Sequence, residues 1–233
     1  VLDSLNRHDG PEPSTFISDR SNITNIPMIE MKTPSRKIEH LHNIYFTPLG
    51  NPQTAEITYP ALANRNFLNK LDLVVLPSPQ EANDLRKRLK TKIPITSIPV
   101  GVIPDDQLNT PRIAMNKRIP GKIIAIARLF WDKRLDDAIY AFNKAYKKHP
   151  NLTFDIWGYG DTSDNFKEER KLKKLVVDLH LESVVTFKGY TQDIQKVYQQ
   201  AQLMILSSRL EGAPLSILEA QSNGVPTISY DMN

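Results

Sequence analysis

The stretch KIIAIARLFWDKRLDDAIYAFNKAYKKHPNLTFDIWG, residues 122–158, decides the fold class of this chain. It begins with an apolar run, 122–129, and closes with another, 152–158, and each is typical of a buried strand. Between them, residues 134–149 have the spacing of an amphipathic helix, whose apolar face consists of Leu135, Ile139, Phe142 and Tyr146. The order strand, helix, strand predicts a βαβ unit.

The same alternation continues toward the carboxyl end of the chain. After a helix pattern at 165–181, the sequence predicts strands at 184–189, 203–208 and 226–230, with helices at 193–201 and 213–223 between them. Strands that alternate with helices over this length are typical of a parallel sheet. The second half therefore predicts an α/β domain.

The first half carries fewer signals. We expect a buried strand at 71–79, a helix over Glu81–Leu89, and shorter strands at 39–46 and 96–104. Residues 1–36 contain proline and serine clusters and support no assignment. The polar stretch 104–121 holds three prolines and predicts a linker. We therefore expect an amino-terminal domain at 1–105, a linker at 106–120 and a second domain at 121–233.

The composition bounds the class of protein. The 233 residues are 40% hydrophobic and 24% charged, as in a globular protein. The absence of cysteine excludes disulfides and thiolate metal sites. No apolar run is long enough to span a bilayer, and no signal peptide is visible, so we expect a cytoplasmic protein. The net charge of +4 fits a solvated surface, an anionic ligand or an anionic membrane face, which leaves peripheral association with the inner face of the membrane open.

Two carboxylates flank a predicted helix start in SSRLEGAPLSILEAQSNGVP, residues 207–226. Pro214 suits the first turn of a helix, so Glu211 lies in the preceding loop and Glu219 lies inside the helix. At the carboxyl end of a parallel sheet, such acids face whatever binds there, and they could accept hydrogen bonds from sugar or ribose hydroxyls. The alternative is that Glu211 caps the helix and Glu219 is solvated.

Two cations follow the first strand of the second half. Arg128 ends the predicted strand, and Lys133 stands just before the next helix. A planar guanidinium and a point-charge ammonium in this order can bind a diphosphate. The alternative is that both are ordinary surface charges.

The series A-R-L…K-R-L, G-Y-G, F-K-G-Y and S-S-R-L-E-G-A-P-L-S-I-L-E-A…G-V-P resembles the nucleotide-sugar-binding half of the family 4 retaining glycosyltransferases. The match covers about 121–231. The resemblance implies the GT-B architecture, with two Rossmann-like domains that each contain a parallel sheet. Because family members continue beyond both ends of this pattern, we expect both domains to be incomplete, and the second to be truncated at its carboxyl end.

The resemblance also implies roles for single residues. Arg128 and Lys133 would hold the donor diphosphate and neutralise the leaving nucleotide without a metal ion or other cofactor. Glu211 would contact the donor sugar near its reacting carbon, and Glu219 would bind the ribose. The other implied donor-binding residues are Gly158, Gly160, Lys188, Gly189, Tyr190, Gly212, Ala213 and Leu215. Among these, Tyr190 is equally compatible with a core position.

The first half resembles the acceptor-side domain of the family more faintly, in FLNKLDLVVLPSPQEANDLRKRL and ITSIPVGVIPD. The family often places a histidine near the reacting centre, and HLHN offers His40 and His42, of which His42 fits slightly better. A solvated or packed histidine pair is the alternative. Two histidines without a further ligand cluster do not make a zinc site, so we expect no metal.

Together these features predict a retaining, metal-independent transfer of a hexosyl unit from a nucleotide diphosphate sugar, most simply a UDP-sugar, to a hydroxyl acceptor on a glycan, polymer or protein. The upstream region is similar to bacterial enzymes that glucosylate cell-wall polymers such as poly(glycerol phosphate), or serine-rich surface proteins. Two alternatives stay open: a nucleotide-sugar epimerase on the same fold, and a non-catalytic partner that stabilises or targets an active enzyme. Basic residues interspersed with acids, as in 167–174, argue against a nucleic-acid-binding module.

Overall fold

The structure is a computed structural model in which the chain forms two compact units, one comprising Val1–Val100 with Glu211–Ala213 and Asn233, the other Gly101–Leu210 with Pro214–Met232. It describes residues 14–19, 28, 30–31, 34–42, 46–47, 56–57, 69–89, 92–101, 112–160, 162, 165–209 and 211–231.

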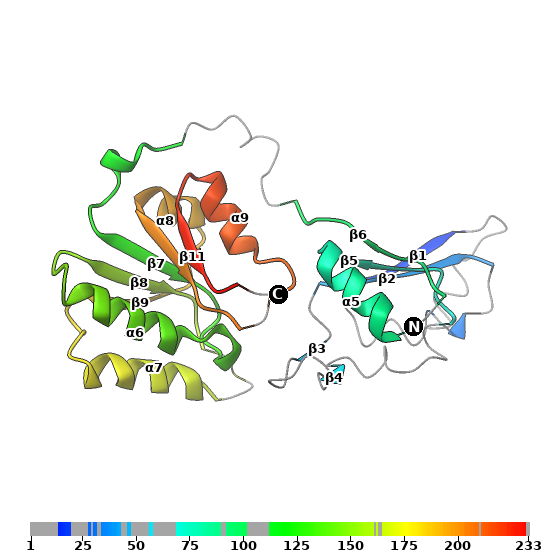
Figure 1. Cartoon of the computed structure of the whole chain (residues 1–233), viewed down its shortest axis with the longest axis horizontal. Coiled ribbons are helices and arrows are strands. Elements are labelled where there is room, and N and C mark those ends of the chain that lie inside the picture. Colours follow the sequence, from blue (N-terminus) through cyan, green and yellow to red (C-terminus); the bar gives the residue numbers. More distant parts are fainter. Residues whose placement is uncertain are drawn as a thin grey trace. The chain divides into compact units, whose positions relative to one another are not determined.

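The first unit contains a four-stranded sheet in the order β1-β2-β5-β6. Its strands are β1 (Thr15–Asp19), β2 (Arg36–His40), β5 (Leu73–Leu76) and β6 (Ile95–Ser97), and all neighbours are parallel. The short strands β3 (Phe46–Thr47) and β4 (Glu56–Ile57) form a separate antiparallel pair. The central strand β5 is the most apolar, with Val74 and Leu76 fully buried, and α5 (Pro79–Leu89) returns along the sheet beside it (Figure 1).

The start of α5 is capped by Ser78, which is hydrogen-bonded to Glu81 three residues later. The Ser78 hydroxyl accepts a hydrogen bond from the backbone N–H of Glu81 at 3.2 Å and donates one to the Glu81 carboxylate at 3.3 Å. Pro79 occupies the first helical position, where its missing N–H would have no partner within the helix. This local chemistry ends β5 and turns the chain into a helix within three residues.

Replacing Glu81 with glutamine is expected to change how the stability of the first unit depends on pH. Burial raises the pKa of Glu81 from its ordinary value to about 7, so the folded state holds this proton more tightly than the unfolded chain does. The stabilisation is complete below about pH 4.5 and is lost as pH rises through about 7. We expect Glu81→Gln to be the more stable protein at pH 8, by about 1–2 kcal/mol once residual solvent contact is allowed for.

Scanning calorimetry at pH 5 and pH 8 checks this expectation. Both tryptophans, Trp131 and Trp157, lie in the second unit. A calorimetric transition that is not accompanied by a change in tryptophan fluorescence therefore belongs to the first unit. Glu30→Gln, at an exposed carboxylate in the same unit, is the control. Equal pH dependence in the wild type and in Glu81→Gln would contradict the argument.

The second unit is a five-stranded parallel sheet with helices on both faces. Its strands are β7 (Lys122–Ile126), β8 (Thr153–Trp157), β9 (Val185–Gly189), β10 (Leu203–Leu206) and β11 (Thr227–Ser229). Its α-helices are α6 (Leu135–Tyr146), α7 (Lys167–Asp178), α8 (Ile194–Gln200) and α9 (Leu215–Ser222), with single 3-10 turns at η3 (Met115–Lys117) and η4 (Trp131–Lys133).

The strand order of this sheet is β11-β10-β7-β8-β9. The chain moves outward from β7 to β9 on one side, and then returns to place β10 on the other side of β7. The direction of winding therefore reverses between β7 and β10. In doubly wound sheets, ligands bind beyond the carboxyl ends of the strands at this reversal.

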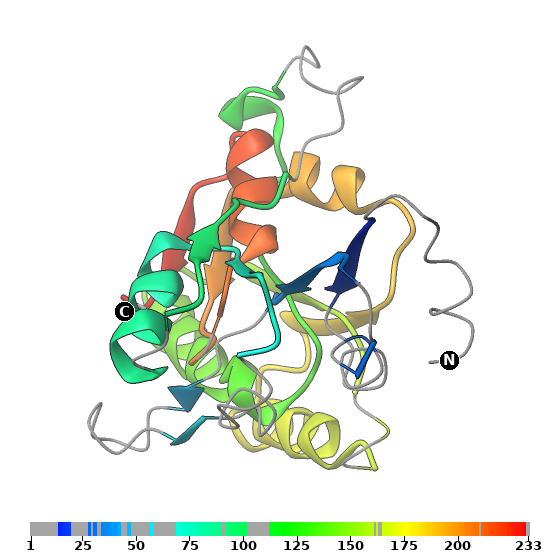
Figure 2. The same cartoon turned by 90° about the vertical axis from the view of Figure 1, so that its right-hand side faces the viewer.

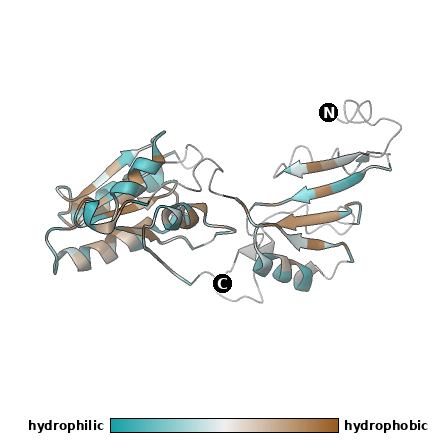
Figure 3. Ribbon diagram, turned by 90° about the horizontal axis from the view of Figure 1, so that it is seen from above, coloured by the Kyte–Doolittle hydropathy of each residue, from teal (hydrophilic) through white to brown (hydrophobic). Residues whose placement is uncertain are grey.

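Alternate side chains of the strands build two cores, one on each face of the sheet. On one face, Ile123 and Phe154 pack with α6 and α7; on the other, Ile124 packs with α8 and α9. The two views in Figures 1 and 2 both show α7 and α8 on opposite sides of the strands. In Figure 3 hydrophobic colour appears on strands and on parts of the helices, as expected for elements that share a buried core.

Residues 112–120 fall within the predicted linker, but in the structure they are fastened to the second unit. The Arg118 side chain is 3% exposed and donates four hydrogen bonds to backbone carbonyls, which belong to Ile113, Tyr198, Ala201 and Asn223. Ile119 N–H also donates to the Gln200 carbonyl at 3.1 Å. Arg118 thus anchors this stretch to the second unit, while residues 106–111 lie outside the described part of the chain, and the linker assignment stays a prediction.

The predicted α/β class is confirmed, and each of the nine strand and helix predictions from residue 122 onward corresponds to an element in the structure. Boundaries differ by a few residues: β7 ends at Ile126, so Arg128 lies beyond the strand, and α9 begins at Leu215 with Pro214 as its cap. In the region without an assignment, the structure contains β1. The expected strand at 39–46 overlaps the end of β2, and residues 43–45 of it lie outside the described residues.

Candidate functional site

The two predicted cations, Arg128 and Lys133, lie in the turn that follows β7. This strand is one of the two between which the direction of winding reverses. Arg128 is exposed, and its guanidinium carbon lies 5.5 Å from the centre of the Phe130 ring, a cation–π distance. Lys133 ends η4, where its N–H donates to the Phe130 carbonyl at 3.0 Å and its ammonium lies 3.6 Å from the Asp132 carboxylate. The turn thus holds both cations between β7 and α6.

The segment after β10 is tied to this turn by two hydrogen bonds. The Ser207 hydroxyl donates to the Lys133 carbonyl at 2.9 Å, and the Arg209 N–H donates to the Asp132 carbonyl at 2.8 Å. Ser207 and Ser208 are both buried. The structure therefore joins the segments that follow the two strands flanking the reversal point.

The carboxyl ends of β7, β8 and β9 are held together at three glycines. Gly158 has φ +131°, its N–H donates to the Gly189 carbonyl at 2.8 Å, and an added Cβ would stand 1.9 Å from the Ala127 carbonyl oxygen. The Gly160 N–H donates to the Glu169 carboxylate at 2.9 Å, and a Cβ there would stand 2.6 Å from the same carboxylate oxygen. Gly158 is thus required by a close backbone contact, whereas at Gly160 the nearest atom belongs to the end of a flexible side chain. The donor contacts that the resemblance implies for both glycines stay predictions.

Lys188 and Tyr190 bracket Gly189 at the end of β9. The Lys188 ammonium lies 3.7 Å from the carboxylate of Asp155, a buried residue that also pairs with Lys122 at 3.0 Å. Tyr190 is 72% exposed, so it is not a core aromatic. The implied contact of this segment with a nucleotide base stays a prediction.

Glu219 is held by a residue that the sequence reasoning missed. The hydroxyl of Tyr198, on α8, donates a 2.6 Å hydrogen bond to the Glu219 carboxylate on α9, and Tyr198 itself is fully buried. Burial, and next the hydrogen bond with Glu219, raise the pKa of Tyr198. Glu219 is therefore not a freely solvated helix residue, and its carboxylate has a fixed orientation.

Tyr198→Phe is expected to lower the free energy of unfolding of the second unit by about 1.5–2 kcal/mol, because a hydrogen bond to a carboxylate is lost from a partly buried place. Urea denaturation followed by tryptophan fluorescence measures the change. Tyr140→Phe, at an exposed tyrosine on α6, is the matched control and should be neutral. Equal losses of unfolding free energy in Tyr198→Phe and Tyr140→Phe would mean that the Tyr198–Glu219 hydrogen bond does not stabilise the second unit.

The remaining predicted donor-side residues lie between β10 and the first turn of α9. Glu211, Gly212 and Ala213 form the loop before Pro214 and are partly exposed, and Leu215 is the first residue of the helix. The structure thus places these residues in a loop and at a helix start, as the sequence predicted. Their contacts with a donor stay predictions.

In the first unit, His42 lies beside His40 and a residue that the sequence reasoning did not consider, Asp19. His42 Nε2 and His40 Nδ1 both contact the Asp19 carboxylate oxygen Oδ1, the second at 3.1 Å. The hydrogen bond with His42 lowers the pKa of Asp19. The segment TFISD has no regular alternation of apolar and polar residues, so no local pattern in the sequence marks Asp19.

None of the helices in the described part of the chain has both the length and the apolar character that a membrane-spanning helix needs.

The second unit is a doubly wound α/β domain with cations after β7 and carboxylates before and within α9. In proteins of this class, ligands bind beyond the carboxyl ends of the strands. The family model described as glycosyl transferases group 1 matches residues 112–233, and the chain belongs to this family.

Two curated relatives match part of the chain. The chain is 35% identical over 138 residues to the UDP-N-acetylglucosamine–peptide N-acetylglucosaminyltransferase GtfA subunit of Streptococcus parasanguinis, covering 59% of this chain and 25% of the relative. It is 38% identical over 110 residues to the poly(glycerol-phosphate) alpha-glucosyltransferase of Bacillus subtilis (strain 168), covering 47% and 16%. The chain thus spans a quarter or less of the length of these relatives.

Among solved structures, the pneumococcal O-GlcNAc transferase GtfA in complex with UDP and GlcNAc has a TM-score of 0.80 and 22% identity, covering all of this chain and 44% of that one. This likeness and the two parallel sheets confirm the predicted GT-B fold class.

Proposed function

We propose that this chain is part of a retaining glycosyltransferase that moves a hexosyl unit from a UDP-sugar to a hydroxyl acceptor. One observation carries the proposal. Arg128 and Lys133 follow β7 at the reversal point of the sheet, on a turn that is hydrogen-bonded to the segment after β10. An anionic ligand at this edge would meet two cations on a turn that is already held in place.

The chemistry of the proposed site supports a nucleotide diphosphate sugar as the donor. A nucleotide diphosphate needs positive charge for its phosphates and an acceptor of hydrogen bonds for its ribose. Arg128 and Lys133 supply the first, and the Glu219 carboxylate, oriented by Tyr198, supplies the second. The names of the relatives support uridine as the base and glucosyl or N-acetylglucosaminyl units as the sugar.

In the reaction, the bond between the sugar C1 and the β-phosphate oxygen breaks, a bond forms between C1 and the acceptor oxygen, and the acceptor hydroxyl passes its proton to the leaving phosphate oxygen. Negative charge grows on the leaving diphosphate, where Arg128 and Lys133 neutralise it. This electrostatic role needs no metal ion. Glu211 orients the donor sugar near C1, and the acceptor attacks from the face that the nucleotide leaves.

The acceptor is proposed to be a hydroxyl of a polymer or a protein. The two relatives are named for a peptide and for poly(glycerol phosphate), and a net charge of +4 suits an anionic acceptor or membrane face. We propose that the protein works in the cytoplasm, at the inner face of the cell membrane, with residues 1–105 as the acceptor-side domain and 121–233 as the donor-side domain.

Arg128→Ala and Lys133→Ala are each expected to weaken UDP binding about tenfold or more, because each removes a charge-assisted contact with the diphosphate of about 1.5–3 kcal/mol. Calorimetric titration with UDP and with UMP checks this, since the loss should be smaller for the monophosphate. Lys144→Ala, on the helix α6 away from its start, is the control. Unchanged UDP affinity in both site variants would overturn the diphosphate assignment.

A further inference from the structure

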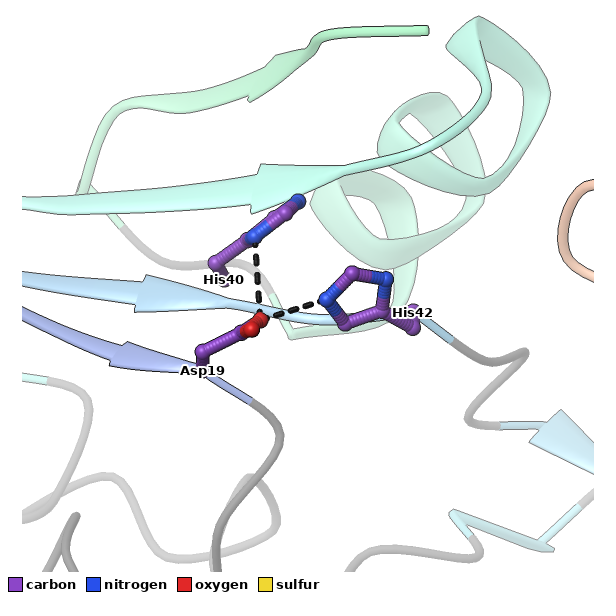
Figure 4. A group of neighbouring side chains, drawn as sticks. All are labelled: Asp19, His40 and His42. Carbon is purple, nitrogen blue, oxygen red and sulfur yellow. Dashed lines mark hydrogen bonds and ion pairs between the residues drawn. The ribbon is translucent and has the colours of Figure 1, made fainter. Parts of the chain in front are cut away.

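Three metal-ligating side chains converge at the carboxyl edge of the first unit's sheet. They are Asp19 at the end of β1, His40 at the end of β2 and His42 two residues later. One ligand atom from each lies within 4.8 Å of the others. Figure 4 shows both imidazole rings directed at the same carboxylate.

The backbone brings these side chains together. Asp19 and His40 are direct partners in the parallel pairing of β1 with β2, so their side chains share one face of the sheet. Leu41 is fully buried and its N–H donates to the Val75 carbonyl at 2.9 Å, so the chain stays extended past His40. His42 therefore returns to the face of His40, and the two ring centres lie 4.3 Å apart.

The spacing suits a small tetrahedral ion. His40 Nδ1 lies 3.1 Å from Asp19 Oδ1, and His42 Nε2 contacts the same oxygen. In a tetrahedral zinc site with bonds near 2.0–2.1 Å, neighbouring ligand atoms are about 3.3 Å apart. Small rotations of the side chains would therefore admit an ion among the three atoms.

The ligand types select the metal. Two imidazole nitrogens and one carboxylate oxygen suit Zn²⁺, whereas Mg²⁺ and Ca²⁺ prefer oxygen ligands alone. The side chains are also within reach of solvent, with Asp19 64%, His40 28% and His42 31% exposed. We propose that Asp19, His40 and His42 form a zinc-binding site with the fourth position open to water or a ligand.

Asp19 supplies a third potential ligand atom that the sequence did not reveal, and the expected absence of a metal is tested by the titration below. The zinc site does not rest on the proposed glycosyl transfer, since the metal would be bound by the first unit alone. A competing account is that the carboxylate only accepts hydrogen bonds from the two rings, and it predicts no metal binding. If His42 also serves the transfer reaction, bound zinc would occupy its nitrogen and inhibit turnover.

Calorimetric titration of the chelator-treated full chain with ZnCl₂ tests the proposal. We expect one Zn²⁺ per chain and no comparable binding of MgCl₂. Asp19→Asn, His40→Ala and His42→Ala should each weaken zinc binding at least tenfold. His149→Ala, at an exposed histidine in the second unit, is the matched control and should bind as the wild type does.

Circular dichroism of each variant shows whether it is folded, and substitution with Co²⁺ gives a second readout, because its visible spectrum reports tetrahedral coordination. Absence of saturable zinc binding by the wild type would overturn the proposal, as would equal affinities in the three site variants and the control. Failure of the zinc proposal can be distinguished from failure of the proposed function, because UDP binding by the second unit is measured in a separate titration without zinc.

Discussion

Arg118→Met is expected to lower the free energy of unfolding of the second unit by about 3–5 kcal/mol, because several buried carbonyls each lose a charged donor worth about 1.5–3 kcal/mol, partly offset by the removal of a buried charge. The side chain is 3% exposed, and its guanidinium donates to four carbonyls at 2.6–2.9 Å. Methionine fills a similar volume but leaves these carbonyls without their donors in a buried place, and each unpaired group costs free energy.

The position of Arg118 explains why an arginine is needed. Two of its acceptors, Tyr198 and Ala201, belong to the carboxyl end of α8, and a third, Asn223, caps the carboxyl end of α9. A positive charge is favourable at helix carboxyl ends because the last carbonyls and the helix dipole are negative there. The fixed fork of the guanidinium can serve several acceptors at once, which the ammonium of lysine cannot do.

Urea denaturation followed by the fluorescence of Trp131 and Trp157 measures this loss, because both tryptophans lie in the second unit. Lys117→Met, at the exposed neighbouring cation, is the matched control and should change the free energy of unfolding by less than about 0.5 kcal/mol. A loss below about 1 kcal/mol for Arg118→Met would show that solvent replaces the missing bonds.

Gly158→Ala is the second change with a large expected effect, about 3 kcal/mol or more of destabilisation. The residue has φ +131°, and its added Cβ would stand 1.9 Å from the Ala127 carbonyl oxygen, so the ends of β7 and β8 must separate. That separation would also weaken the hydrogen bond from Leu129 N–H to the Tyr159 carbonyl. We therefore expect a loss of UDP affinity, because Arg128 stands between Ala127 and Leu129.

Gly189→Ala is the control that distinguishes the cost of backbone strain from the cost of a steric clash. Gly189 also has a positive φ, +71°, but an added Cβ would meet nothing within 4 Å. Its substitution should cost only the strain of a left-handed backbone, about 1–2 kcal/mol. The same fluorescence-detected denaturation compares the two variants, and equal losses would contradict the close contact assigned to Gly158.

Much of the second unit could be predicted from its sequence, because each strand and helix carries a clear period. The apolar runs at β7 and β8 and the stripe of α6 are local signals, and the alternation of elements implies a parallel sheet. The positions of Lys133 and Glu219 relative to these elements followed from counting residues, whereas Arg128 lies beyond the end of β7 and not at it. The strand order was not readable in this way, because it depends on pairings between distant segments.

The contacts that orient the site could not be predicted for the same reason. The Tyr198–Glu219 bond joins residues 21 apart, and the bond from Arg118 to Asn223 joins residues 105 apart. No local pattern marks either partner. In the first unit, β1 is a five-residue strand beside proline- and serine-rich sequence, so Asp19 stayed unnoticed and the histidines seemed to lack a third ligand.

The central claim is that the second unit binds a nucleotide diphosphate sugar at the reversal point of its sheet. Calorimetric titration of the chain with UDP, UDP-glucose, UDP-N-acetylglucosamine and GDP-mannose, without added metal, tests it most directly. The account predicts saturable binding of the uridine nucleotides, weakened at least tenfold in Glu219→Ala. Absence of binding by every one of these nucleotides, or uridine nucleotide binding that is unchanged in Glu219→Ala, would contradict it.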